Sequence, residues 1–216
     1  MPLLSEKDIT YIKGTFDKRL QSDVELTLFI DKEDECDYCQ KTAELLRELC
    51  AISPKLKLEI GNIAADKARA RSLGIDKAPG LLVSAKERRM HVCYFGIPAG
   101  YQFSALLDDI IDISNGKTRL ALSTVEKLRA IKKPVEISVF VSISEELCAG
   151  AVRIAHQFAM ENERIWAGMI DAEKFTELAI HNAVTKVPKV VINGIVNFEE
   201  PLPESEFLEY VLSVAK

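Results

Sequence analysis

The sequence predicts an α/β protein in which one fold occurs twice along the chain. Strand-like apolar runs alternate with amphipathic helical patterns, similar segments recur at a fixed interval, and a Cys-x-x-Cys motif stands between the first strand and the next helix. The 216 residues, 48% of them hydrophobic, suffice for two packed domains. We expect a first domain over residues 1–118 and a second over residues 119–216.

The first half predicts a complete set of alternating elements. Ser5, followed three residues later by an acid, is a suitable N-cap for the first helix. Gly and Pro at residues 74–80 predict a turn before a hairpin. The expected order is a helix at 5–20, a strand at 24–30, a helix at 40–49, a strand at 56–60, a helix at 66–73, hairpin strands at 81–83 and 90–95, and a helix at 101–113.

The second half repeats this order. It predicts a helix at 124–131, a strand at 137–141, a helix at 145–161, a strand at 165–170, a helix at 172–182, hairpin strands at 189–192 and 195–198, and a helix at 204–214. Cys39 and Pro79 are 40 positions apart, as are Cys148 and Pro188, so that both pairs share an offset of 109 residues. A strand–helix–strand crossover in each copy predicts that its first two strands are parallel.

The motif at Cys36 and Cys39 predicts redox chemistry. A sulfur at the start of a helix lies beside free backbone N–H groups and the positive end of the helix dipole, and both favour the thiolate. Cys36 is therefore the expected attacking sulfur. Cys39, one turn further along the same helix face, is close enough to form a disulfide with it and is the expected resolving sulfur.

Two other interpretations of this motif are a zinc site and a structural disulfide. A zinc site would need two more ligands, whereas the remaining cysteines and histidines are scattered along the sequence. Five cysteines without a secretory signal argue against a disulfide framework. We therefore expect no metal.

Composition excludes several partners. The net charge is −5, and neither half has the basic excess of a nucleic-acid-binding protein. The first residues lack a signal-peptide pattern, and no stretch approaches 18 uncharged apolar residues. We expect a cytoplasmic protein that binds neither nucleic acid nor membrane.

The motif, the proline before the third strand and the element order resemble thioredoxin and glutaredoxin. The duplication, with residues 94–100 and 152–159, resembles more closely the glutaredoxin-like protein disulfide oxidoreductases of archaea and thermophilic bacteria. The resemblance implies two tandem thioredoxin-like domains, each a mixed central sheet flanked by helices. It further implies that Cys36 and Cys39 reduce protein disulfides and that Tyr38, Ala78 and Pro79 contact the substrate.

The second copy departs from the family pattern, which has a Cys-x-x-Cys in each half. Glu145 replaces the attacking sulfur, only Cys148 remains, and Pro188 keeps the place of Pro79. Dithiol exchange cannot run there, so we expect a degenerate second site. Ser144 followed by two glutamates predicts a helix start with the serine as N-cap.

We expect no bound cofactor beyond the redox-active disulfide of Cys36 and Cys39. The sequence has no Gly-x-Gly-x-x-Gly after a strand, so the expected electron donor is a separate thioredoxin-reductase-like flavoprotein. Residues 31–37 contain five acids and one base, which oppose the thiolate. We expect the pKa of Cys36 to lie nearer the thioredoxin end than the oxidant end of the known range, as in a reductant.

Other thiols and imidazoles are expected to be structural. Cys50 and Cys93 are predicted core residues, His91 could share a metal with Cys93 on one strand face, and His156 and His181 lie on predicted helices without an evident partner. The function predicted first is reduction of protein disulfides. The alternatives are a dedicated electron donor to a peroxiredoxin or ribonucleotide reductase, and a binding scaffold whose dithiol senses redox state.

Overall fold

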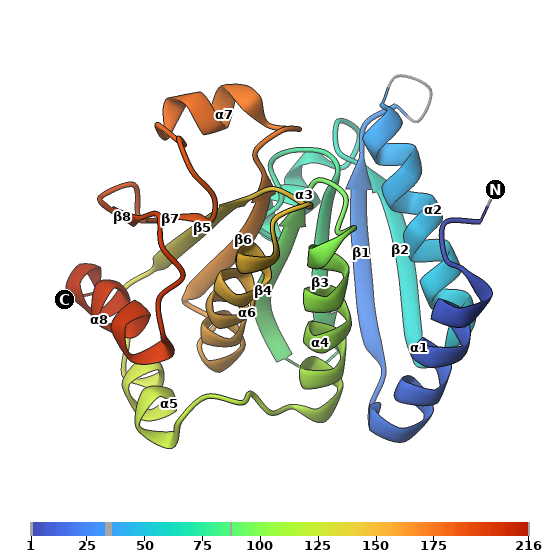
Figure 1. The fold of residues 1–216 in the computed structure, drawn as a ribbon, viewed down its shortest axis with the longest axis horizontal. Coiled ribbons are helices and arrows are strands. Elements are labelled where there is room, and N and C mark those ends of the chain that lie inside the picture. The colour runs from blue at the N-terminus through green and yellow to red at the C-terminus, as the bar shows by residue number, and fades with distance from the viewer. Residues whose placement is uncertain (1, 33–35, 87, 216) are drawn as a thin grey trace.

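The same series of elements occurs twice in the computed structural model, which describes residues 2–32, 36–86 and 88–215. The first series is α1 (Glu6–Arg19), β1 (Val24–Ile30), α2 (Asp37–Ile52), β2 (Leu56–Asn62), α3 (Lys67–Ser72), β3 (Gly80–Ala85), β4 (Arg88–Phe95) and α4 (Tyr101–Asn115) (Figure 1). The second is α5 (Leu122–Arg129), β5 (Val135–Val141), α6 (Glu146–Glu161), β6 (Ile165–Asp171), α7 (Thr176–His181), β7 (Lys189–Ile192), β8 (Val196–Phe198) and α8 (Glu204–Val214).

Local sequence signals explain most element boundaries. Ser5 caps α1 as predicted, because its hydroxyl accepts a hydrogen bond from the N–H of Asp8 while the Asp8 carboxylate accepts one from the N–H of Ser5. Helix α7 begins later than expected. The carboxylate of Asp171 accepts hydrogen bonds from the N–H groups of Glu173 and Lys174 and thereby closes a turn before the helix.

All strands belong to one sheet with the order β2-β1-β3-β4-β6-β5-β7-β8. Strands β1 and β2 are parallel, as are β5 and β6, which confirms the predicted crossovers. Each half contributes a mixed set of strands, as predicted. The sequence did not predict that the two sets join into one sheet, in which β4 pairs in parallel with β6 from His91 opposite Trp166 to Phe95 opposite Ile170. The expected division after residue 118 stays a prediction.

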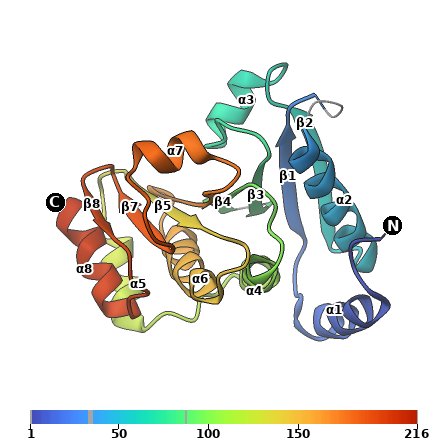
Figure 2. The same cartoon turned by 45° about the horizontal axis from the view of Figure 1, so that its top comes forward.

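Alternation along the strands sends side chains to opposite faces of this sheet, where they form two cores. Leu28 and Ile30 belong to the larger core, whereas Phe29 between them belongs to the smaller one, which includes Ala70 of α3 and Ala179 of α7. Figure 2 shows α3 and α7 on one side of the sheet and α4 and α6 on the other. Both faces are therefore covered by helices, as the α/β class requires.

The strand directions place several functional segments at one edge of the sheet. Because β1, β2, β4, β5 and β6 are mutually parallel, their carboxyl ends meet at the same edge. The Cys-x-x-Cys segment follows β1 there, and the turn after β6 lies at this edge as well. Within the described part of the chain, no helix is both long and apolar enough to traverse a bilayer.

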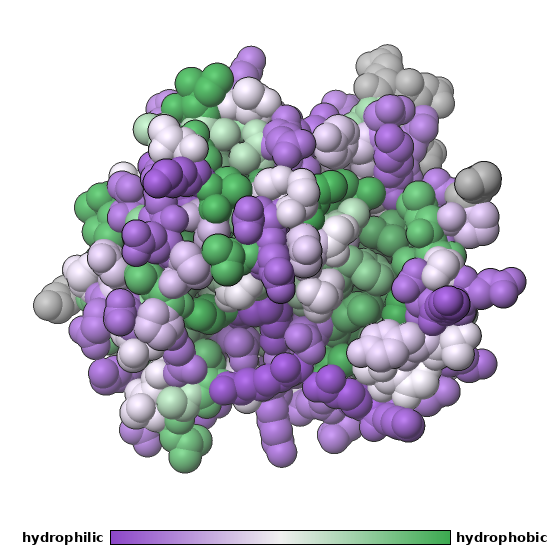
Figure 3. Space-filling view, in the orientation of Figure 1, coloured by the Kyte–Doolittle hydropathy of each residue, from purple (hydrophilic) through white to green (hydrophobic). Residues whose placement is uncertain are grey.

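Surface polarity varies over the face that Figure 3 displays. Polar side chains are interspersed with hydrophobic ones, and a hydrophobic group lies at the upper edge over α7. Ile180 of α7 is 72% exposed. The helix that covers the smaller core thus leaves apolar surface near the edge of the sheet where the Cys-x-x-Cys segment lies.

Candidate active site

Cys36 and Cys39 form a disulfide at the amino end of α2. Cys36 is the N-cap residue in an extended conformation, and its sulfur accepts a hydrogen bond of 3.2 Å from the N–H of Cys39. Cys36 is half-buried, whereas Cys39 is completely buried. Cys36 is thus the more accessible of the two sulfurs. The roles of Cys36 as attacking sulfur and Cys39 as resolving sulfur stay a prediction. Residues 33–35, which carry three of the predicted acids, lie outside the described residues.

The proline loop lies at the same edge of the sheet as this disulfide. The peptide bond between Ala78 and Pro79 is cis, and Gly80 at the start of β3 pairs with Phe29 near the end of β1. The carbonyl of Pro79 accepts a hydrogen bond from the N–H of Gly96. Ala78 and Cys36 both pack at the margin of the larger core. The predicted substrate-binding residues of this loop therefore lie at the same sheet edge as the dithiol.

The second half of the chain also reaches the site, which sequence reasoning missed. The ammonium of Lys174 lies 5.1 Å from the ring centroid of Tyr38, the residue between the two cysteines. Burial, followed by the charges of Asp171 and Glu173, raises the pKa of Tyr38. The turn that carries Lys174 is held by Asp171, a buried carboxylate whose pKa is itself raised by burial.

The repeat offset could have pointed to this turn. Asn62 occupies the position of Asp171 in the first copy, and its side-chain oxygen accepts hydrogen bonds from the N–H groups of Ala64 and Ala65. Lys174 takes the place of Ala65. The two copies thus share one turn, but only the second carries a cation there.

The second copy keeps the shape of a dithiol site without its chemistry. Glu145, the counterpart of Cys36, is the N-cap of α6 and accepts a hydrogen bond from the N–H of Leu147 at 3.4 Å. The prediction that Ser144 caps this helix is wrong. The N-cap is Glu145, which lies 109 residues after Cys36, the N-cap of α2 in the first copy. Cys148 is fully buried, and burial raises its pKa to about 11. Val187 and Pro188 are joined by a second cis bond.

The other thiols lie away from this chemistry. Burial raises the pKa of Cys50 to about 11, and it also raises the pKa of the fully buried Cys93. Both are protonated at neutral pH and are therefore poor nucleophiles. His181 is exposed and His91 is half-buried. The described residues contain no group of three or more His, Cys, Asp or Glu side chains that could hold a metal ion.

His156 does have an acidic partner, so the prediction that it lacks one is wrong. Its Nδ1 lies 2.6 Å from Oδ2 of Asp109, and both side chains are completely buried. Burial, reinforced by Arg153, lowers the pKa of His156 to about 3. The imidazole of His156 is therefore neutral at neutral pH. Because a carboxylate only accepts hydrogen bonds, Nδ1 carries the ring hydrogen and donates it to Asp109.

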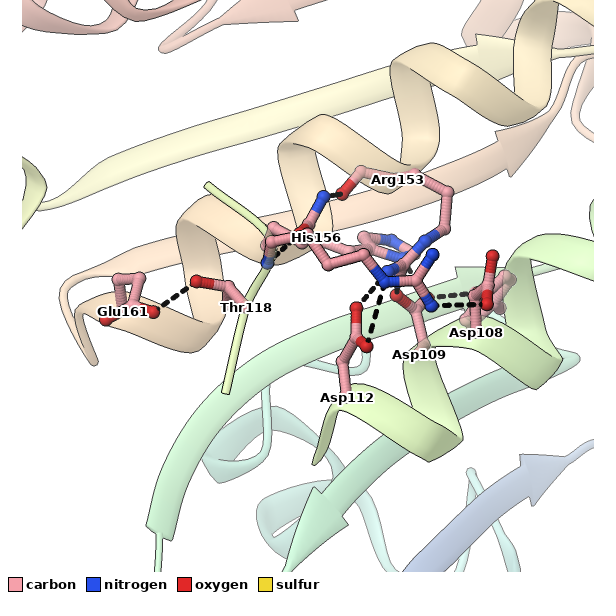
Figure 4. Close-up of polar contacts among 10 residues, drawn as sticks. Asp108, Asp109, Asp112, Thr118, Arg153, His156 and Glu161 are labelled. Carbon is pink, nitrogen blue, oxygen red and sulfur yellow. Dashed lines mark hydrogen bonds and ion pairs between the residues drawn. The ribbon is translucent and has the colours of Figure 1, made fainter. Parts of the chain in front are cut away.

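His156 belongs to a cluster of charges that joins the two halves (Figure 4). Arg153 and His156 lie on α6, and they face Asp109 and Asp112 of α4; Arg153 forms ion pairs with both carboxylates. The hydroxyl of Tyr94 donates to Asp109. Asp109 and Asp112 are three residues apart, as are Arg153 and His156, so each pair lies on one face of its helix. That these two faces meet follows only from the packing of α4 against α6 in the structure.

Comparisons with known proteins agree with this geometry. The family model of the thioredoxin domain matches residues 135–213. A solved protein disulfide oxidoreductase from Aeropyrum pernix K1 is 28% identical, with a TM-score of 0.89 over 98% of this chain and 93% of its own. The NTD_N/C domain of alkylhydroperoxide reductase AhpF from Enterococcus faecalis is similar in fold, at 23% identity, a TM-score of 0.87, and coverage of 96% and 99%.

Curated relatives share sequence over most of the chain. The alkyl hydroperoxide reductase AhpF of Staphylococcus aureus is 23% identical over 175 residues, which is 81% of this chain. The match spans 31% of that relative, so this chain corresponds to about a third of its length.

Proposed function

We propose that the chain reduces disulfide bonds in other proteins through Cys36 and Cys39, because it has two tandem thioredoxin-like folds and is similar over nearly its whole length to a protein disulfide oxidoreductase. The observation that carries this proposal is the Cys36–Cys39 disulfide at the amino end of α2, at the same sheet edge as a cis-proline loop. The accessible sulfur accepts a backbone hydrogen bond that also stabilises a thiolate.

The reaction is an exchange of thiols and disulfides. The Cys36 thiolate attacks one sulfur of the substrate disulfide, that bond breaks, and the departing substrate sulfur takes up a proton. The Cys39 thiolate then attacks the Cys36 sulfur of the mixed disulfide and releases the second substrate thiol. Two electrons have passed to the substrate, and the Cys36–Cys39 disulfide remains for an external donor to reduce.

Insulin reduction with dithiothreitol tests this proposal. We expect the wild-type chain to accelerate precipitation of the insulin chains, C36S to abolish the acceleration and C39S to accumulate the mixed disulfide. C148S is the matched control, because this buried thiol has a raised pKa and should not contribute. A wild-type rate equal to that of dithiothreitol alone would refute the proposal, and client binding that survives C36S would then favour a redox-sensing scaffold.

A second candidate is electron donation to one peroxide-reducing enzyme. The match to the alkyl hydroperoxide reductase AhpF over 81% of the chain favours it. The test is to mix the reduced chain with an oxidised peroxiredoxin and follow loss of the Cys36 and Cys39 thiols. Faster oxidation by the peroxiredoxin than by insulin would support this role.

The electron supply and location complete the proposal. We assign the reduction of the Cys36–Cys39 disulfide to a thioredoxin-reductase-like flavoprotein and place the chain in the cytoplasm, where thiols are kept reduced. Reconstitution with NADPH and such a flavoprotein, with C36S as control, tests the donor.

A further inference from the structure

We propose that the chemically silent second half completes the substrate groove of the first, and that Lys174 in this groove selects substrates with a carboxylate close to the target disulfide. This inference rests on the proposed disulfide reduction and adds a substrate class to it. Lys174 is a specificity residue here, because it meets the substrate beside the reacting sulfurs and takes no part in the exchange.

A groove of about 420 Å³ lies between the proline loop and the start of α7. One side is Lys77, which directly precedes the cis Ala78–Pro79 bond. The other side is formed by residues 174–178 of the second half, among which Phe175 and Leu178 supply apolar surface. Lys174, which lines this groove, also has its ammonium 5.1 Å from the ring centroid of Tyr38, the residue between the two cysteines.

Lys174 is held in place before any substrate arrives. Its backbone belongs to the turn that Asp171 closes, its side chain is half-buried, and its ammonium lies against the ring of Tyr38. Among the described residues, no carboxylate lies within ion-pair distance of it. A cation that is already ordered and partly dehydrated loses less entropy on binding a carboxylate than a mobile surface lysine.

The other charges around the groove are engaged or exposed. Lys77 pairs with Asp76, and its ammonium lies 4.1 Å from the ring centroid of Phe95. Glu173 accepts a hydrogen bond from Ser142, and the buried Asp171 accepts two from the backbone. Glu177 also lines the groove; it is exposed and would repel a second acid there. Lys174 is thus the cation in this groove that can bind a substrate carboxylate beside the dithiol.

The test uses disulfide-containing peptides that differ only in one residue next to the target cysteine, which is Glu, Gln or Lys. We expect the wild-type kcat/KM to be about twofold to fivefold higher for Glu than for Gln, as for a single partly exposed ion pair, and lower again for Lys. K174Q should remove this ranking, K174E should invert it, and added salt should shrink it. K13E is the matched control, because Lys13 is an exposed lysine on α1, away from this edge of the sheet (Figure 1).

The outcomes separate the inference from the function on which it rests. Turnover of all three peptides with the same ranking in K174E as in the wild type would overturn the role of Lys174 and leave disulfide reduction intact. An equal loss on all peptides, accompanied by a changed pKa of Cys36, would also overturn it, because Lys174 would then act on the thiol. Absence of turnover with every peptide would refute both.

Discussion

Removal of Arg153 should destabilise the chain strongly, because this side chain neutralises two buried carboxylates between the halves. Its side chain is 12% exposed, and its partners Asp109 and Asp112 are 0% and 6% exposed. Loss of one partner from a buried ion pair leaves an uncompensated charge and costs about 3–5 kcal/mol. Asp109 keeps its hydrogen bonds to Tyr94 and His156, and Asp112 keeps Arg119, so we expect a cost near the lower end for R153M.

Equilibrium urea unfolding, followed by circular dichroism, measures this cost. For a chain of this size, about 3 kcal/mol corresponds to a fall in Tm of roughly 6–12 °C. R69M is the matched control, because Arg69 is 46% exposed and its partner Glu59 is 57% exposed, outside this cluster. We expect it to cost less than about 1 kcal/mol. A cost below about 1 kcal/mol for R153M would refute the argument that the cluster binds the halves together.

Three further predictions concern His156, Cys36 and Gly100. Burial lowers the pKa of His156 from 6.5 to about 3, so the unfolded chain binds one more proton than the folded chain between these pH values. His156 should therefore destabilise the fold progressively as the pH falls from 6.5 towards 3. H156Q should reduce the slope of the unfolding free energy against pH by up to about 1.4 kcal/mol per pH unit in this range. An unchanged slope in urea titrations at several pH values would contradict this. The exposed Asp37 should oppose the Cys36 thiolate, so D37N should lower the pKa of Cys36 in a titration of thiolate absorbance; an equal or higher value would exclude this carboxylate as the cause. Gly100 has φ +56°, and a Cβ there would lie 2.2 Å from the carbonyl oxygen of Ile143, so G100A should lower the free energy of unfolding by about 1–3 kcal/mol in thermal unfolding. G150A is the control, because an added Cβ there meets nothing within 4 Å and should not destabilise the fold. A loss of stability in G150A would point to a general effect of alanine.

Patterns within each half predicted the larger part of the fold. The offset between Cys39 and Cys148 predicted two copies with one element order, and the strand–helix–strand crossovers predicted the parallel pairs. The same offset places Glu145 at the helix cap that Cys36 occupies in the first copy. These features depend on neighbours along the chain, which the sequence displays directly.

The contacts between the halves were not predictable in this way. Lys174 reaches Tyr38, and Arg153 reaches Asp109, only because β4 and β6 pair and α4 packs on α6. Nothing in the periodicity of either half specifies which edges of the two sheets will join. His156 was interpreted as lacking a partner for this reason, since its carboxylate lies 47 positions earlier in the chain.

The backbone pairing between β4 and β6 fixes the two halves of the chain relative to each other. A swing of the first half away from the second would have to break a ladder of five residue pairs. The dithiol therefore keeps one orientation relative to the second half, so that a protein approaching Cys36 would meet residues of both halves, Tyr38 and Lys174 among them.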